Sequence, residues 1–228
     1  MGNLLRRLFG GESKQKQSAS SASPGASPAV RQQQEPVIVV SGLPRSGTSM
    51  MMKMLDAAGV NPVIDEIRAA DVDNPKGYYE FERVKQMDKG DVAWLADAPG
   101  KSVKVISALL RFLPADYEYR VIFMRRAMPE ILASQRKMLK HREEFNDASK
   151  QEDVSDEEIA ALFDAHLKQV FDWVKTQPNI RLLEIDYNAM LVDPEPYAQQ
   201  IAAFLPWSLD AQTMAEVVDP DLYRNRAQ

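Results

Sequence analysis

The stretch Pro36-Val-Ile-Val-Val-Ser-Gly-Leu-Pro-Arg-Ser-Gly-Thr-Ser-Met50 decides how this chain folds. Its apolar, β-branched run, Val37–Val40, predicts a buried strand. A turn rich in Gly, Pro and Ser follows, and the apolar residues after it predict a helix over 49–58. The first N–H groups of a helix have no partner within the helix, and the helix dipole adds positive charge there. This order of strand, loop and helix therefore predicts a site for a phosphate-bearing ligand at residues 42–49.

The loop differs from the P-loop of nucleoside triphosphatases, G-x-x-x-x-G-K-[ST], at one important position. Gly42 and Gly47 have the right spacing and Ser49 occupies the hydroxyl position, but Thr48 stands where the motif has lysine. In nucleoside triphosphatases that lysine contacts the outer phosphates. The only cation in this loop is Arg45, three residues earlier. The sequence therefore predicts a phosphate site that works without the P-loop lysine.

Six consecutive residues of this loop carry a resemblance to a known family. They fit the pattern P-[KR]-S-G-T-[TS] at every position, and the loop resembles the 5′-phosphosulfate-binding loop of sulfotransferases. The resemblance implies that the donor 3′-phosphoadenosine 5′-phosphosulfate is bound by six residues, namely Pro44, Arg45, Ser46, Gly47, Thr48 and Ser49. The alternative is an ordinary strand-turn-helix unit without a ligand.

A second segment, residues 121–134, predicts a strand that runs into a helix, with two arginines at the strand's carboxyl end. Open α/β sheets bind ligands at that edge. It resembles the sulfotransferase segment R-[DN]-P-x-x-x-x-x-S, whose Arg and Ser hold the 3′-phosphate of the donor, because Arg126 and Ser134 have the same spacing. It departs from that pattern at Ala127 and in the shift of the proline to Pro129. Solvated surface arginines are the alternative.

Strand-like and helix-like segments alternate from residue 36 onward, which predicts an α/β fold with a mainly parallel sheet. The resemblance implies a three-layer, P-loop nucleoside-kinase-like sulfotransferase fold. Further strands are expected at 102–106, 120–124 and 181–185, and further helices at 129–144, 155–176 and from Asp193 onward.

The N-terminal residues differ in composition from the rest, so we expect a single sulfotransferase-like domain over 36–228. Residues 11–35 are rich in Ser, Ala, Gln and Pro, and they predict a disordered linker. Residues 1–10 predict a short amphipathic segment. A weak membrane-surface contact through residues 1–9, a partner-docking peptide and a functionless terminus are all consistent with it.

Composition excludes several classes of protein. The chain has no cysteine, which excludes disulfides, thiol catalysis and cysteine-ligated metal. No apolar run approaches the roughly 18 residues of a membrane span. The first 35 residues hold five basic and two acidic side chains, so residues 36–228 have a net charge of −8, which argues against a nucleic-acid partner. We expect a cytoplasmic protein, at most peripheral to the membrane, without a metal.

The resemblance implies transfer of a sulfuryl group from 3′-phosphoadenosine 5′-phosphosulfate to an acceptor hydroxyl or amine of a small molecule, carbohydrate or lipid. Arg45 and the loop amides would stabilise the leaving 5′-phosphate. Lys104, in a segment that looks like the lysine-bearing strand of bacterial sulfotransferases, would share this role. Tyr187 lies where an aromatic of the family approaches the adenine, and Arg224 lies where the family closes over the donor.

An acceptor hydroxyl also needs a base. Residues 74–80 resemble an N-P-x-G-[YFW]-x-E element of bacterial relatives, which makes Glu80 the first candidate and Glu66 the second. Solvated loop carboxylates are the alternative. His166 lies on an apolar helical stripe and is expected in the core, and His141 lies among charged residues.

Two other functions stay open at this level. A kinase or nucleoside triphosphatase is supported by Leu182–Asp186, which resembles a Walker B strand with a metal-binding aspartate, and is opposed by Thr48. A catalytically inactive nucleotide-binding or scaffold protein of the same fold is the second alternative.

Overall fold

A computed structural model describes residues 35–65, 79–145 and 155–219. For residues 138–145 it describes the backbone alone. Several sequence predictions therefore lie outside the described residues: the N-terminal segment 1–10, the linker up to residue 34, Glu66 and Arg224.

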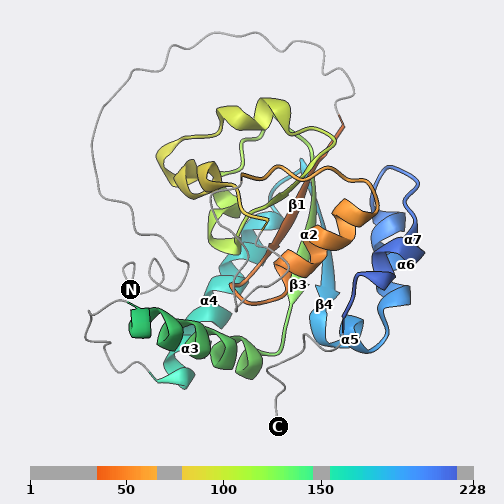
Figure 1. Cartoon of the computed structure of the whole chain (residues 1–228). Helices are drawn as coiled ribbons and strands as arrows, with labels where there is room; N and C mark the ends of the chain where they lie inside the picture. Colours follow the sequence, from red (N-terminus) through yellow and green to blue (C-terminus); the bar gives the residue numbers. More distant parts are fainter. Residues whose placement is uncertain (1–34, 66–78, 146–154, 220–228) are drawn as a thin grey trace.

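Four parallel strands form the centre of the molecule (Figure 1). The strands are β1 (Val37–Gly42), β2 (Ser102–Lys104), β3 (Tyr119–Arg125) and β4 (Ile180–Asp186). Their order across the sheet is β2-β1-β3-β4, and each neighbouring pair is parallel. The predicted α/β fold with a parallel sheet is thereby confirmed. The strand predicted over 102–106 ends early, because a 3₁₀ helix begins at Ser107.

The strand order places two connections opposite each other at one edge of the sheet. The chain leaves β1 toward β2 on one side, whereas β3 and β4 lie on the other side of β1. Connections that leave neighbouring strands in opposite directions open a crevice at the strands' carboxyl ends. In the register of β1 and β3, Gly42 pairs with Met124, so both strands end at the same level. The loop after β1 and the turn after β3 therefore meet at this crevice.

Helices cover both faces of the sheet (Figure 1). The α-helices are α2 (Thr48–Ala57), α3 (Met128–Phe145), α4 (Asp156–Val174), α5 (Tyr187–Val192), α6 (Pro194–Phe204) and α7 (Ala211–Glu216). The 3₁₀ helices are η1 (Glu82–Lys89), η2 (Ala93–Asp97) and η3 (Ser107–Phe112). No helix within the described ranges is long and apolar enough to cross a membrane.

Alternation along β1 produces two separate cores, because successive strand side chains point to opposite faces. Val37 and Val39 pack with side chains from α3, α4 and the 3₁₀ helices. Ile38 and Val40 pack with α2 and with α5, α6 and α7. The molecule thus has the three layers that the family resemblance implied.

The longest helix, α4, begins where its sequence predicts. The Ser155 hydroxyl accepts a hydrogen bond from the Glu158 amide at 3.2 Å, and the Glu158 carboxylate accepts one from the Ser155 amide at 3.0 Å. This reciprocal capping box satisfies two of the amides that a helix start leaves unpaired. The short helices α5 and α7 were not predicted, since six residues are too few to show a helical period.

His166, on α4, is partly buried where this helix contacts η3, so it lies at the edge of the core and not within it, whereas its place on the apolar stripe predicted a core position. Its Nε2 atom is 2.9 Å from Oγ of the buried Ser107. Burial, reinforced by the positive charge of Arg111, lowers the pKa of His166 below its usual value. The imidazole is therefore a structural group that favours its neutral form in the folded chain.

Gly47 ends the loop after β1 in a conformation that a side chain would obstruct. Its φ is 98°, and a β-carbon there would lie 2.2 Å from Cδ2 of Tyr187. Gly59, which follows α2, has a similar φ of 88°, but a β-carbon there would have no heavy atom within 4 Å. Both glycines have a positive φ, and only at Gly47 does a ring lie close to the position of a β-carbon.

We expect the stability of the chain to fall as the pH is lowered from about 7.5 to about 5.5. Because the pKa of His166 is lowered in the folded chain, the unfolded chain takes up the proton first as the pH falls. The contribution of His166 to the free energy of unfolding is therefore complete above the histidine pKa of the unfolded chain, about 6.5, and is lost as the pH falls below it. In the His166→Gln variant, the free energy of unfolding should depend less steeply on pH, as measured by urea unfolding at several pH values. Equal slopes for the two proteins would contradict this role for His166.

The Gly47→Ala variant should lose clearly more stability than Gly59→Ala. Both substitutions place an L-residue in the left-handed region, at a cost of about 1–2 kcal/mol each. Only the change at Gly47 also forces a methyl group into the Tyr187 ring. Urea unfolding of the two variants and the wild type measures the difference in unfolding free energy. Equal losses in the two variants would show that the Tyr187 ring can move aside without a loss of stability.

Candidate functional site

The loop between β1 and α2 is a tight turn with one strained residue. Arg45 has a φ of 70°, an uncommon conformation for a residue with a side chain. The Ser46 amide donates a hydrogen bond to the Leu43 carbonyl at 3.2 Å. The Ser46 side chain is buried beneath the turn, where a β-carbon on Gly42 would lie 2.4 Å from its hydroxyl. Four of the six predicted loop residues are partly exposed beside Gly47: Pro44, Arg45, Thr48 and Ser49.

The helix that follows presents its amide end to the same place. The first hydrogen bonds of α2 are donated by the amides of Met50 and Met51 to the Gly47 carbonyl, at 3.1 and 3.2 Å. The amides of Thr48 and Ser49 come before these bonds and point along the helix axis toward the loop. Such an end favours an anion through its N–H groups and its dipole. The strand, loop and helix start are therefore arranged as predicted, and anion binding there stays a prediction.

Two hydrogen bonds join this loop to the segment after β3. Arg45 donates from Nε to Oγ of the buried Ser134 at 2.9 Å. Arg126 donates from Nη1 to the backbone carbonyl oxygen of Arg45, also at 2.9 Å. These contacts connect residues that are 89 and 81 positions apart in the sequence. The structure thus brings together the two groups of residues that the sequence proposed separately for phosphate binding.

The Arg126 side chain is held on three sides, in what we call the Arg126 clamp. Besides the Arg45 carbonyl, the clamp contains Glu130, whose Oε2 accepts a hydrogen bond from Nε of Arg126 at 3.0 Å. The third member is Tyr187, whose ring centre lies 4.8 Å from the guanidinium carbon. Glu130 was missed in the sequence, although its spacing of four from Arg126 at a helix start was a usable indication.

Tyr187 contacts both the loop after β1 and Arg126. Its buried ring lies close to Gly47 and against the guanidinium of Arg126. Burial raises the pKa of its hydroxyl above the usual value. Helix α5, which carries it, is tied to the turn after β3, because the Asn188 side chain accepts a hydrogen bond from the Ala127 amide at 3.0 Å. Tyr187 therefore supports both halves of the site, and its approach to an adenine stays a prediction.

Lys104 and Glu80 lie at the other flank of the loop. Lys104, at the end of β2, donates from Nζ to Oγ of Ser49 at 3.3 Å. The same Nζ atom is 3.8 Å from Oε1 of Glu80, and Nζ of Lys85 is 3.2 Å from Oε2. The carboxylate of Glu80 thus bridges two ammonium groups beside the start of α2. Lys104 and Glu80 are therefore close together beside the loop, and their roles in catalysis stay predictions.

The aspartate of the Walker B alternative is not at the loop. Asp186 ends β4, which is separated from β1 by β3. Its carboxylate accepts a hydrogen bond from the Ala189 amide at 3.0 Å and so caps α5. Within the ranges that the structure describes, no group of three or more His, Asp or Glu side chains is arranged to hold a metal. These positions give the Walker B interpretation no support.

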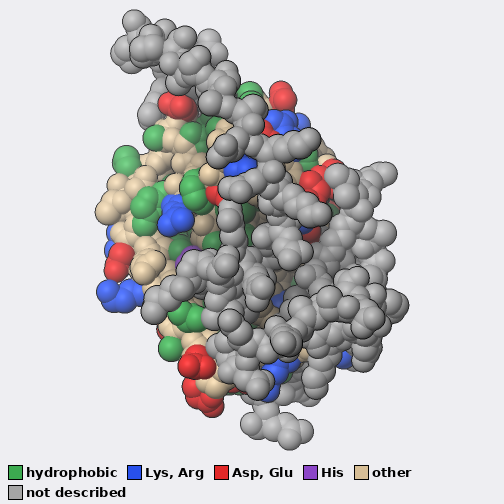
Figure 2. Space-filling view, turned by 90° about the vertical axis from the view of Figure 1, so that its left-hand side faces the viewer, with side chains coloured by type: hydrophobic (Ala, Val, Ile, Leu, Met, Phe, Trp, Pro, Cys, Tyr) green, Lys and Arg blue, Asp and Glu red, His purple; other side chains and the backbone are tan. Residues whose placement is uncertain are grey.

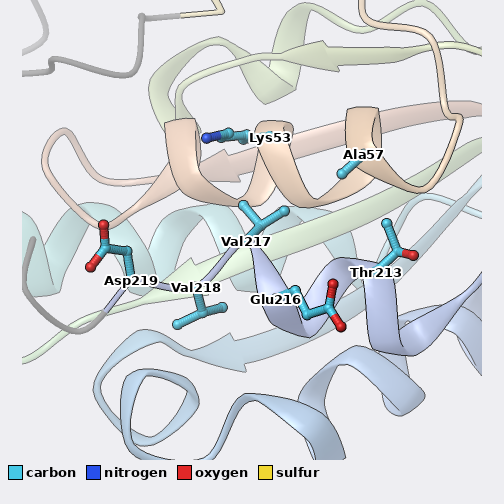
Figure 3. Close-up of a pocket in the computed structure, with 7 residues that line it drawn as sticks. All are labelled: Lys53, Ala57, Thr213, Glu216, Val217, Val218 and Asp219. Carbon is cyan, nitrogen blue, oxygen red and sulfur yellow. The ribbon is translucent and has the colours of Figure 1, made fainter.

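A shallow pocket lies elsewhere, between α2 and α7 (Figure 3). It is lined by Lys53, Ala57, Thr213, Glu216, Val217, Val218 and Asp219. None of the residues predicted for the site lines it. On the face shown in Figure 2, the described side chains alternate between apolar, basic and acidic without a large field of one sign.

Comparison with known proteins identifies a family. The family model described as the sulfotransferase domain matches residues 35–220. Comparison with curated protein sequences gives no match.

Three solved structures have similar folds at low sequence identity. A sulfotransferase from Mycobacterium avium is 15% identical, with 86% of this chain and 70% of that chain covered and a TM-score of 0.49. The sulfotransferase domain of the olefin synthase of Synechococcus PCC 7002 is 12% identical, with 89% and 87% covered and a TM-score of 0.49. A sulfotransferase domain from the curacin biosynthetic pathway is 14% identical, with 86% and 80% covered and a TM-score of 0.46.

The family model spans most of the chain and includes the loop after β1, the turn after β3 and every contact described between them. The chain therefore belongs to the sulfotransferase domain family and is a sulfotransferase enzyme.

Proposed function

We propose that this enzyme transfers the sulfuryl group of 3′-phosphoadenosine 5′-phosphosulfate to an acceptor hydroxyl or amine. The observation that carries the proposal is the direct contact between the two candidate phosphate sites, Arg45 with Ser134 and Arg126 with the Arg45 carbonyl. A donor with anionic groups on both its 3′ and 5′ positions needs two anion sites a ribose apart. Two such sites, joined by hydrogen bonds, fit this donor better than a nucleotide with a single phosphate chain.

In this proposal, the 5′-phosphosulfate and the 3′-phosphate of the donor are bound by different groups of residues. The 5′-phosphosulfate lies at the amide end of α2, where Thr48, Ser49 and the guanidinium of Arg45 supply donors. The 3′-phosphate lies against Arg126 and Ser134, since a guanidinium offers a two-pronged donor and a hydroxyl completes it. Thr48 in place of the P-loop lysine leaves the outer phosphates of a nucleoside triphosphate without their usual cation.

In the transfer step, the bond between sulfur and the bridging oxygen of the 5′-phosphate breaks, and a bond between sulfur and the acceptor oxygen forms. Negative charge develops on the bridging oxygen, where Arg45 and Lys104 neutralise it. Glu80, 3.8 Å from Nζ of Lys104, accepts the proton of the acceptor hydroxyl. The protein thus contributes positioning and charge neutralisation, as in phosphoryl transfer.

The acceptor in this proposal is a small molecule, a carbohydrate or a lipid. The scheme uses side-chain cations throughout and calls for no metal. We further propose that the enzyme works in the cytoplasm, with peripheral membrane contact through residues 1–9 as the arrangement to test if the acceptor is a lipid.

Adenosine 3′,5′-bisphosphate should stabilise the wild-type chain, by about 2.7 kcal/mol at 100 times its dissociation constant. ADP and ATP with magnesium should give much smaller increments, since neither carries a 3′-phosphate. The Arg126→Ala variant should lose the increment of the bisphosphate, measured as the ligand-induced change in thermal unfolding so that any loss of basal stability cancels.

Arg125→Ala is the matched control for that measurement. Arg125 lies one position earlier, is 45% exposed and pairs with Glu184 at 3.3 Å. Its removal should leave the increment unchanged. Stabilisation by ATP with magnesium in place of the bisphosphate, or an Arg126→Ala variant that responds like the wild type, would contradict the proposed donor.

Glu80→Gln should reduce turnover by about 10²-fold or more, because the amide cannot accept the acceptor proton. Release of adenosine 3′,5′-bisphosphate from the donor, in the presence of a panel of phenols, sugars and hydroxylated lipids, measures the rate. Glu82→Gln is the control, since Glu82 also pairs with Lys85 but makes no such contact with Lys104. Full turnover in Glu80→Gln would remove Glu80 from the mechanism.

A further inference from the structure

A negative charge is buried beside the arginine that we assign to the 3′-phosphate. The side chains of Arg126 and Glu130 are 7% and 3% exposed, and their nitrogen and oxygen are 3.0 Å apart. A carboxylate near a bound phosphate is repelled by it. Buried ion pairs also add little stability over an apolar pair of similar volume. The burial of Glu130 at this point therefore calls for an explanation in terms of function.

We propose that Glu130 is a positioning residue that fixes the guanidinium of Arg126 for the 3′-phosphate. The inference rests on the donor assigned under Proposed function. An arginine side chain has several rotatable bonds, and each must be fixed for a two-pronged contact with phosphate. In the Arg126 clamp, Glu130 holds Nε, the Arg45 carbonyl holds Nη1, and the Tyr187 ring fixes the guanidinium plane. An Arg126 guanidinium held in this way loses less conformational freedom when the phosphate binds.

The start of α3 supports this role through its spacing. Arg126, Glu130 and Ser134 stand at successive intervals of four, so they follow one face of the helix and the turn that leads into it. Glu130 lies in the first turn of α3, where the helix dipole favours a negative charge. The ion pair with Arg126 and the helix dipole both favour the charged form of the buried Glu130 carboxylate. The same face of α3 and its leading turn carries Arg126 and Ser134, the two residues that we assign to the 3′-phosphate.

The neighbouring pair of Arg125 and Glu184 shows what an ordinary surface contact looks like in this chain. Its atoms are 3.3 Å apart and its side chains are 45% and 50% exposed. Exposed pairs of this kind contribute little, because water screens them and both side chains stay mobile. The two pairs start from adjacent arginines, so the comparison separates the effect of burial and clamping from the mere presence of a carboxylate.

The test compares the affinities of adenosine 3′,5′-bisphosphate and adenosine 5′-phosphate for the full chain by calorimetry. The ratio of their dissociation constants measures recognition of the 3′-phosphate. Glu130→Ala should reduce this ratio by about tenfold or more, through weaker binding of the bisphosphate alone. Glu130→Gln, whose amide oxygen still accepts a hydrogen bond from Nε, should keep the ratio within about threefold of the wild type. Glu184→Ala should leave it unchanged.

Three results would overturn the inference: a wild-type ratio in Glu130→Ala, tighter binding of the bisphosphate by either variant, or a Gln variant as impaired as the Ala variant. Tighter binding would mean that the carboxylate competes with the phosphate. Should Glu130→Ala fail to fold, Glu130→Asp, one methylene too short to reach Nε, should show the same loss. A wild type without any preference for the bisphosphate would instead refute the donor assignment itself, before any variant is compared.

Discussion

The hydrogen bond from Arg126 to the carbonyl of Arg45 joins the two halves of the site, and the arrangement around it depends on that bond. It forms because β1 and β3 are neighbouring parallel strands that end at the same level, with Gly42 opposite Met124. Tyr187 packs against Arg126 and beside Gly47, which has no side chain to keep the ring away. The strand register, the glycine and the aromatic ring are therefore parts of one constraint, which holds the loop after β1 against the turn after β3.

The proposed function requires an acidic chain to hold an anionic donor. Residues 36–228 have a net charge of −8, so long-range attraction does not favour a phosphate. Attraction must come from groups within a few ångströms, namely the amide end of α2 and the side chains of Arg45, Lys104 and Arg126. Each of these side chains already contacts oxygen atoms of the protein, which holds it in place. Local cations with fixed geometry thus replace a general positive field.

The sequence predicted the fold and the two segments that meet at the strand ends, because both depend on local patterns; phosphate binding by these segments stays a prediction. The run Val37–Val40, the glycine-containing loop and the helix after it are contiguous, and the carboxyl ends of parallel strands share an edge. The buried position of Glu130 was harder to predict, since its burial depends on helices and loops that meet only in the folded chain. The approach of Tyr187 to an adenine stays a prediction, and the packing of its ring on Gly47 and Arg126 was not predicted because these residues are far apart in sequence.

A crystal structure of the chain with adenosine 3′,5′-bisphosphate would show whether the two candidate phosphate sites bind one donor. We expect the 5′-phosphate on the amides at the start of α2, and the 3′-phosphate in contact with Arg126 and Ser134 while Glu130 still accepts a hydrogen bond from Nε of Arg126. A bisphosphate bound in the pocket between α2 and α7 beside Lys53, without contact to Arg126, would contradict it.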